Sequence, residues 1–227
     1  MSVYAVSDLH GYLNLYKQIK NFLKPEDIVY FLGDACDRGP QSWETVKAIA
    51  ADPQFIYIRG NHEQLLANMI EDIIEQKEDT VLYKNCMVNG TLATVREWQK
   101  ECGLQTGWLK YLNKLPFSET YINTNNKKII LCHAGFTPHR GNNIMLGKDL
   151  LWDRKHIKDS YWPEYTDDNM IIVHGHTPVI YHTNIPGAYF YCDGHKIDID
   201  CGTYEFPNYC CLLNLDTFEE HLFEIED

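Results

Sequence analysis

Short apolar runs recur along the first part of the chain, and each of them ends in a turn that contains glycine. The runs at Ser2–Ser7, Ile28–Leu32 and Phe55–Arg59 are typical of buried strands. Between them, Leu13–Leu23 and Trp43–Ala51 place apolar side chains at helical spacing, and a proline follows each. Successive strand–helix units of this kind predict a parallel sheet with right-handed crossovers.

The pattern changes twice further along the chain. Residues from Glu63 to about Leu112 are mostly helical in spacing, with a less regular stretch at Gln76–Gly90. From Thr120 onward, short alternating or apolar runs predict strands at 128–132, 170–173, 196–201, 209–215 and 221–225. We therefore expect the second half of the chain to supply a second sheet.

These elements predict an α/β fold with α+β elements, in which two packed mixed β-sheets are flanked by helices. No repeat, low-complexity segment or linker divides the sequence, so a single domain over residues 1–227 is expected. The helical segment at about 63–115 is cap-like, and we favour a packing layer over a substrate-selecting lid for it.

Composition narrows the possible partners and the expected compartment. The 227 residues are 44% hydrophobic, which is enough for a substantial core. The net charge of −12 argues against nucleic acid as a partner, and no apolar run is long enough to span a membrane. The N-terminus lacks the basic region of a signal peptide, so we expect a cytoplasmic protein whose eight cysteines are reduced.

Polar side chains follow five of the predicted strands. They are Asp8 and His10, then Asp34, then Asn61 and His62, then His133, and finally His174 and His176. Strand ends of an open α/β sheet meet at one edge, so these groups are expected to converge. Carboxylate, amide and imidazole donors suit divalent manganese, iron or zinc. Two such ions that share one carboxylate are a known device for hydrolysing phosphate esters.

The motifs in this order carry a resemblance to a known family. They are Asp8-Leu9-His10-Gly11, Gly33 to Gly39, Gly60-Asn61-His62-Glu63, His133-Ala134-Gly135 and Gly175-His176. They resemble those of calcineurin-like metallophosphoesterases, and within that family those of the serine/threonine phosphoprotein phosphatases of phages and bacteria. The fold that this resemblance implies is the metallophosphoesterase-like sandwich.

The resemblance also implies two divalent metal ions per chain, manganese in the first place, with iron and zinc as alternatives. The six implied ligands are Asp8, His10, Asp34, Asn61, His133 and His176. The first three would hold one ion and the last three the other, with Asp34 bridging both. His174 is interpreted as a residue behind the site rather than a ligand.

Catalytic and substrate-binding roles follow from the same resemblance. His62 is expected to be the general acid that protonates the leaving oxygen, and Asp37 to orient its ring and raise its pKa. Arg38 is expected to grip phosphate oxygens, because its planar guanidinium offers paired donors. Arg154 resembles a second phosphate-binding arginine. The implied reaction is direct attack on phosphorus by a metal-bound hydroxide, with no phosphoenzyme.

The leading hypothesis is a dinuclear-metal-dependent phosphomonoester hydrolase that acts on phosphoserine and phosphothreonine in proteins, and also on phosphotyrosine. The alternative is a dinucleoside polyphosphate (diadenosine tetraphosphate) hydrolase, whose metal site is much the same. The Asp37–His62 pair and Glu63 favour the phosphatase. The expected partner is a phosphorylated protein or a small phosphoester. A non-catalytic sensing module is disfavoured because His62 and every motif ligand are present.

Overall fold

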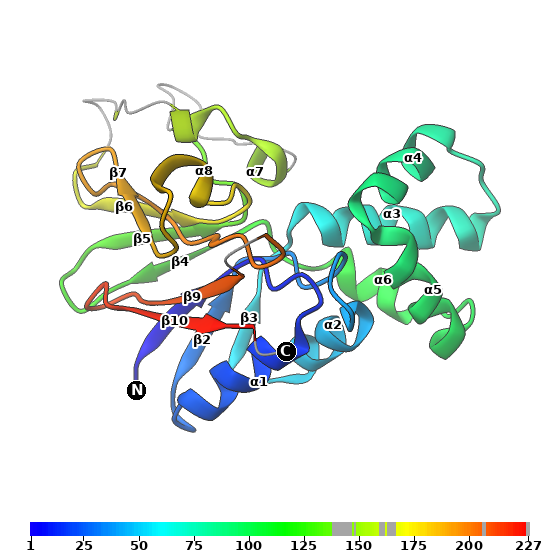
Figure 1. Cartoon of the computed structure of the whole chain (residues 1–227), viewed down its shortest axis with the longest axis horizontal. Helices are drawn as coiled ribbons and strands as arrows, with labels where there is room; N and C mark the ends of the chain where they lie inside the picture. The colour runs from blue at the N-terminus through cyan, green and yellow to red at the C-terminus, as the bar shows by residue number, and fades with distance from the viewer. Residues whose placement is uncertain (138–146, 148, 159–161, 163–166, 206–207, 226–227) are drawn as a thin grey trace.

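Two five-stranded sheets lie against each other, with helices on their outer faces (Figure 1). This computed structural model describes residues 1–137, 147, 149–158, 162, 167–205 and 208–225. Both sheets are mixed, so the predicted α/β fold of two packed mixed sheets flanked by helices is confirmed.

The first sheet contains the three strands that the apolar runs predicted. β1 (Val3–Val6), β2 (Ile28–Phe31) and β3 (Phe55–Tyr57) pair in parallel, which confirms the expected parallel arrangement. The connecting helices are α1 (Leu13–Phe22) and α2 (Ser42–Ala51). The carboxyl ends of the three strands therefore point to the same edge of the sheet.

The last two strands return to this first sheet. β9 (Tyr209–Asn214) pairs antiparallel with β1, with Leu213 opposite Ala5, and β10 (Glu220–Glu224) pairs with β9. The second half does supply a second sheet, as expected, but the strands predicted at 209–215 and 221–225 belong to the first sheet instead. A local pattern marks a strand but not its partner, and β1 has an edge opposite β2 that β9 covers.

The second sheet comes from the middle of the chain. Its strands in spatial order are β4 (Ser118–Ile122), β5 (Lys128–Cys132), β6 (Met170–His174), β8 (Lys196–Asp198) and β7 (Tyr189–Tyr191). β5, β6 and β8 are parallel, and the two edge strands are antiparallel to them. The short helices of this part are α7 (Asp149–Trp152), η1 (His156–Lys158) and α8 (Ile180–Thr183).

Four helices fill the segment between β3 and β4. They are α3 (Asn61–Glu75), α4 (Thr80–Asn89), α5 (Thr91–Cys102) and α6 (Gly107–Leu112), and they lie together beside the sheets (Figure 1). The less regular stretch expected at Gln76–Gly90 is instead largely the helix α4. Its apolar side chains are mostly exposed, so no helical period appears. The Asp79 carboxylate caps it by accepting from the N–H groups of Val81 and Leu82.

The core holds the strand ends in place from both sides of the first sheet. Val3 and Ala5 of β1 face the second sheet, whereas Tyr4 and Val6 pack toward the helices. On the helical side, Trp98 of α5 joins the same core. In the part of the chain that the structure describes, no helix is long and apolar enough to cross a membrane. The single domain over residues 1–227 stays a prediction.

Candidate active site

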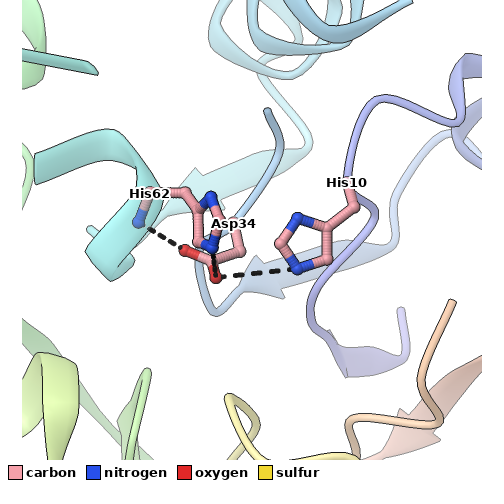
Figure 2. A group of neighbouring side chains, drawn as sticks. All are labelled: His10, Asp34 and His62. Atoms are coloured by element: carbon pink, nitrogen blue, oxygen red, sulfur yellow. Dashed lines mark hydrogen bonds and ion pairs between the residues drawn. The ribbon is translucent and has the colours of Figure 1, made fainter. Parts of the chain in front are cut away.

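Loops from both sheets bring three histidines to one carboxylate, that of Asp34. Oδ2 of Asp34 lies 3.8 Å from Nε2 of His10, 3.7 Å from Nε2 of His62 and 3.4 Å from Nε2 of His133. Figure 2 shows the rings of His10 and His62 reaching Asp34 from separate segments of the chain. All four side chains are buried. The predicted convergence of strand-end residues is therefore present.

Glu63, in the first turn of α3, ties the loops after β2 and β3 together. Its carboxylate is fully buried and has four donors around it. These are the backbone N–H groups of Asp34, Ala35 and Gly60, at 2.7–2.8 Å, and the hydroxyl of Tyr57, at 2.8 Å. The positive end of the α3 dipole also favours a carboxylate at this position. Glu63 thus fixes the backbone that carries Asp34.

The backbone around the site is held in unusual conformations. Non-glycine residues with left-handed φ include Asp8 (55°), His10 (41°), Asp34 (62°), Asp37 (72°), Arg38 (68°) and His176 (75°). Each such residue costs free energy, and such strain gathers at functional sites. These backbone conformations in the turns after the strands direct the side chains toward one point.

Gly33 allows β2 to turn into this site, and we expect its replacement by alanine to destabilise the fold. Its φ is +95°, and an added Cβ would lie 2.4 Å from the backbone nitrogen of Gly60. The left-handed backbone alone costs about 1–2 kcal/mol. Gly194→Ala is the matched control, since Gly194 has φ +84° and nothing within 4 Å of its Cβ position. Thermal unfolding should show a clearly larger loss of stability for Gly33→Ala than for the control. Equal losses of stability would contradict the role given to the close contact with Gly60.

His10 and His133 each direct an unprotonated ring nitrogen toward the Asp34 carboxylate. Nδ1 of His10 lies 2.9 Å from the carbonyl oxygen of Cys36, and Nδ1 of His133 lies 2.8 Å from that of Leu32. A carbonyl only accepts, so each Nδ1 carries the proton and donates it. Each Nε2 lone pair then faces Asp34. Metal-binding histidines are held in this way, with the outer N–H donated to a backbone carbonyl.

The remaining predicted ligands lie in the same place. Nε2 of His133 is 2.7 Å from Oδ1 of Asn61 and 3.2 Å from Nδ1 of His176. Asp8 Oδ1 lies 3.8 Å from Nε2 of His10, and its Oδ2 accepts the backbone N–H of His176. All six residues of the predicted ligand set are thus brought together. The predicted assignment of ions to them stays a prediction.

This set of facing carboxylates and nitrogen lone pairs is suited to binding divalent cations. Among the described residues, two groups of close donor atoms, His10–Asp34–His62 and Asp34–His133–His176, share Asp34; the first includes His62, which is not in the predicted ligand set. Burial, and then Asp8 and Glu63, raise the pKa of Asp34 well above its ordinary value. Burial, and then a neighbouring histidine and arginine, hold the pKa of both His10 and His176 well below the usual range, which favours the neutral form that binds metals. Cations between these groups would compensate the facing carboxylates and lone pairs.

His62 differs from His10 and His133, because its outer nitrogen meets a carboxylate. Nδ1 of His62 donates to Oδ2 of Asp37 at 2.6 Å, so Nε2 faces the centre. The orientation predicted for the pair is present. The expectation that the pKa of His62 is raised is wrong: burial, and then Arg38 and His133, hold it well below the usual value. Burial raises the pKa of Asp37 to about 6.

The two predicted phosphate-binding arginines are both exposed. Nη1 of Arg38 lies 3.3 Å from Nε2 of His10 and Nη2 lies 3.3 Å from Nε2 of His62, so its guanidinium covers the centre. Arg154 follows α7 and is near enough to lower the pKa of His62 and of His176. Trp152 of α7 is 46% exposed, with its ring 6.0 Å from that of His176.

Three further residues at the site were not singled out from the sequence. Thr91 and Thr94 donate hydrogen bonds to the Asp37 carboxylate, and the Arg38 guanidinium lies 3.7 Å from the ring centre of Tyr204. The threonines are 54 and 57 positions away from Asp37 in the sequence. No local motif marks them, so only the folded chain reveals them. His174, as expected, is buried behind the site, with Nε2 2.7 Å from the hydroxyl of Tyr191.

Comparison with known proteins begins with the sequence. The profile of the family described as calcineurin-like phosphoesterase matches residues 1–209. The asymmetrical bis(5'-nucleosyl)-tetraphosphatase PrpE of Oceanobacillus iheyensis is 27% identical, covering 91% of this chain and 89% of the relative. PrpE of Anoxybacillus flavithermus is 28% identical, covering 66% and 63%. The symmetrical bis(5'-nucleosyl)-tetraphosphatase of Buchnera aphidicola is 27% identical, covering 61% and 46%. This chain therefore spans less than two thirds of the last two relatives.

Solved structures show the same fold at low sequence identity. The crystal structure of a candidate diadenosine tetraphosphatase has a TM-score of 0.66 at 16% identity, covering 97% of this chain and 92% of that one. A metallophosphoesterase from Sphaerobacter thermophilus has a TM-score of 0.61 at 16% identity, covering 100% and 90%. A serine/threonine phosphatase from Saccharomyces cerevisiae has a TM-score of 0.57 at 15% identity, covering 100% and 81%.

These comparisons correct the leading hypothesis on function. The three curated relatives are named as bis(5'-nucleosyl)-tetraphosphatases, and none of them is named as a protein phosphatase. The preference for a phosphoprotein substrate is therefore wrong, and the alternative, a dinucleotide hydrolase, is the better supported of the two. The Asp37–His62 pair and Glu63, on which that preference was based, therefore did not discriminate between the two branches.

Proposed function

The chain belongs to the calcineurin-like phosphoesterase family, and on this basis we propose that it hydrolyses dinucleoside polyphosphates such as diadenosine tetraphosphate. The observation that supports this most strongly is the pair of donor groups that share Asp34, in a chain whose relatives carry tetraphosphatase names. Hydrolysis adds water across one P–O–P linkage: one new P–O bond forms, the old bridging bond breaks, and two nucleotides leave.

The proposed metal ligands are the predicted ones: Asp8, His10, Asp34, Asn61, His133 and His176. Divalent cations held there would supply Lewis acidity toward phosphoryl oxygens and an activated water. Manganese as the native metal is a prediction. The protein's own contribution is to orient these donors through Glu63 and the backbone carbonyls of Cys36 and Leu32.

Arg38 and His62 are proposed to act on the substrate itself. The Arg38 guanidinium lies over the centre and can donate two hydrogen bonds to phosphoryl oxygens. Nε2 of His62 faces the same space and is placed to hold the proton that the leaving oxygen takes. A polyphosphate brings several negative charges, which favour a proton on that nitrogen. Arg154 is proposed as a second phosphate contact from the exposed side of the site.

Replacing Arg38 with lysine is expected to lower kcat/KM for diadenosine tetraphosphate by about 10- to 100-fold. This corresponds to the roughly 1.5–3 kcal/mol of a hydrogen bond to a charged group, since lysine cannot reproduce the paired guanidinium donors. Bound metal should not change. Lys47, which pairs with Glu44 and Glu101 on the surface, gives a control when replaced by arginine. A parent-like kcat/KM in Arg38→Lys would remove the arginine from phosphate binding.

The substrate assignment is tested by direct comparison of the two substrate classes. Metal-loaded protein is incubated separately with diadenosine tetraphosphate and with a panel of phosphoserine, phosphothreonine and phosphotyrosine peptides. We expect nucleotide release from the dinucleotide at a far higher kcat/KM. Chromatography of the products then separates cleavage into equal halves from cleavage into unequal nucleotides. Turnover of the peptides alone would contradict the proposal.

A further inference from the structure

The Asp37 carboxylate is fully buried, with the Cys36 thiol as a neighbour, and three other side chains hold it through oxygen or nitrogen donors. The Thr91 hydroxyl donates to Oδ2 at 2.5 Å, and the Thr94 hydroxyl donates to Oδ1 at 2.6 Å. Nδ1 of His62 donates to the same Oδ2 that Thr91 reaches. Each of the three donors is at most 1% exposed. Both oxygens of Asp37 are therefore engaged, and the direction of the carboxylate is fixed.

The two threonines are placed on one face of one helix. They occupy the first turn of α5, three positions apart, so their side chains are neighbours on its surface. The positive end of the helix dipole lies at this turn and favours a carboxylate beside it. Threonine is a weaker helix former than alanine or leucine. Apolar residues in these places would leave the buried Asp37 carboxylate without two of its donors, so the hydroxyls serve a polar task.

The backbone of the helical segment also packs on the catalytic loop. Gly90, which joins α4 to α5, has φ +87°, and an added Cβ would lie 3.0 Å from the backbone nitrogen of Arg38. The helices therefore meet the Asp37–Arg38 turn through the backbone at Gly90 and through the hydroxyls of Thr91 and Thr94.

We propose that Thr91 and Thr94 are positioning residues for His62, acting through the Asp37 carboxylate. By fixing that carboxylate, they fix the tautomer and the ring direction of His62, and so the place of Nε2. The proposal rests on the proposed role of His62 in proton transfer, and not on which phosphoester is the substrate. It gives the helical segment a part in catalysis in addition to packing.

The test replaces the two hydroxyls while keeping the side-chain shape. In the metal-loaded Thr91→Val/Thr94→Val protein, kcat for diadenosine tetraphosphate should fall by about 10- to 100-fold, the usual effect of groups that orient functional ligands. KM and bound metal should stay close to the parent. Thr91→Ser/Thr94→Ser keeps both hydroxyls and should recover most of the lost kcat. Thr94→Val alone provides the same comparison if the double variant does not fold.

A double-mutant cycle separates positioning from a structural role. If the threonines act through His62, the valine replacements should have little further effect in the His62→Asn protein. A structural role would lower kcat by the same factor in both backgrounds. Equal factors, a parent-like kcat in the valine variant, or a serine variant as impaired as the valine variant would each overturn the proposal.

One readout needs no substrate and keeps the two proposals distinguishable. In the zinc-loaded protein, the proton on Nδ1 of His62 should give a downfield NMR resonance that disappears in Asp37→Asn. The valine variant should shift or broaden it, and the serine variant should preserve it. If the parent protein does not hydrolyse diadenosine tetraphosphate but the variants show these changes in the resonance, the proposed function is contradicted and the positioning role is not. An unchanged resonance in the valine variant contradicts the positioning role.

Discussion

Replacing Asp34 with asparagine is expected to remove both cations and to lower turnover of diadenosine tetraphosphate by at least about 10⁴-fold. Asp34 is the one residue common to both donor groups, and its carboxylate lies 3.4–3.8 Å from the Nε2 atoms of three histidines. Each cation supplies several kcal/mol of stabilisation to the transition state, and about 1.4 kcal/mol corresponds to a factor of ten. An amide retains the shape of the side chain but loses its charge.

Metal content is the measurement that checks this result, by elemental analysis of the purified protein after dialysis against the metal. Asp27→Asn is the control, because Asp27 is also buried but accepts the backbone N–H groups of Ser2 and Lys24 far from the site. We expect Asp27→Asn to lower stability without loss of metal. Full metal occupancy and near-parent turnover in Asp34→Asn would contradict the bridging role of Asp34.

Replacing His62 with asparagine is expected to lower kcat by about 10²- to 10⁴-fold, the usual contribution of a general acid. Nδ1 of His62 donates to Asp37 at 2.6 Å, which leaves Nε2 directed toward the centre and the Arg38 guanidinium. Asparagine removes the proton donor without altering the predicted ligand set. Metal content should therefore stay at the parent level, in contrast to Asp34→Asn.

Rates under saturating substrate, with metal content measured on the same samples, check this second result. His195→Asn is the control: the His195 ring stacks on Trp162, and its Nδ1 donates to the carbonyl oxygen of Met170, away from the site. It should leave kcat unchanged. If His62→Asn kept the parent rate, His62 would have no part in proton transfer; if it lost metal, His62 would be a ligand instead.

Much of the first sheet and of the site could be predicted, because the signals are local. β1, β2 and β3 are apolar runs that each end in a turn, and each turn carries its own functional residues. In parallel strands, this order alone places Asp8, Asp34 and Asn61 at one edge. The metal-site geometry then follows from residues that are close in sequence to a strand end.

What could not be predicted depends on contacts between distant parts of the chain. β9 joins β1 although more than two hundred residues separate Tyr4 from its partner Asn214. Nothing near Thr91 in the sequence indicates that its hydroxyl meets Asp37. The helix α4 is stabilised by its Asp79 cap rather than by an apolar stripe, so the period-based prediction missed it.

The error on substrate has a different cause. The roles proposed for the motif residues are common to phosphoester hydrolases: cation binding at Asp34, phosphate binding at Arg38 and proton transfer at His62. None of these proposed roles involves the part of a substrate that distinguishes a phosphoprotein from a dinucleotide. The sequence motifs therefore predicted the reaction, while the choice of leaving group required comparison with related chains.

The most direct measurement is a crystal structure of the protein loaded with manganese, with anomalous scattering used to locate the ions. The account predicts two anomalous peaks, one on each side of the Asp34 carboxylate, with His10 beside one and both His133 and His176 beside the other. A single peak, or peaks away from Asp34, would contradict it.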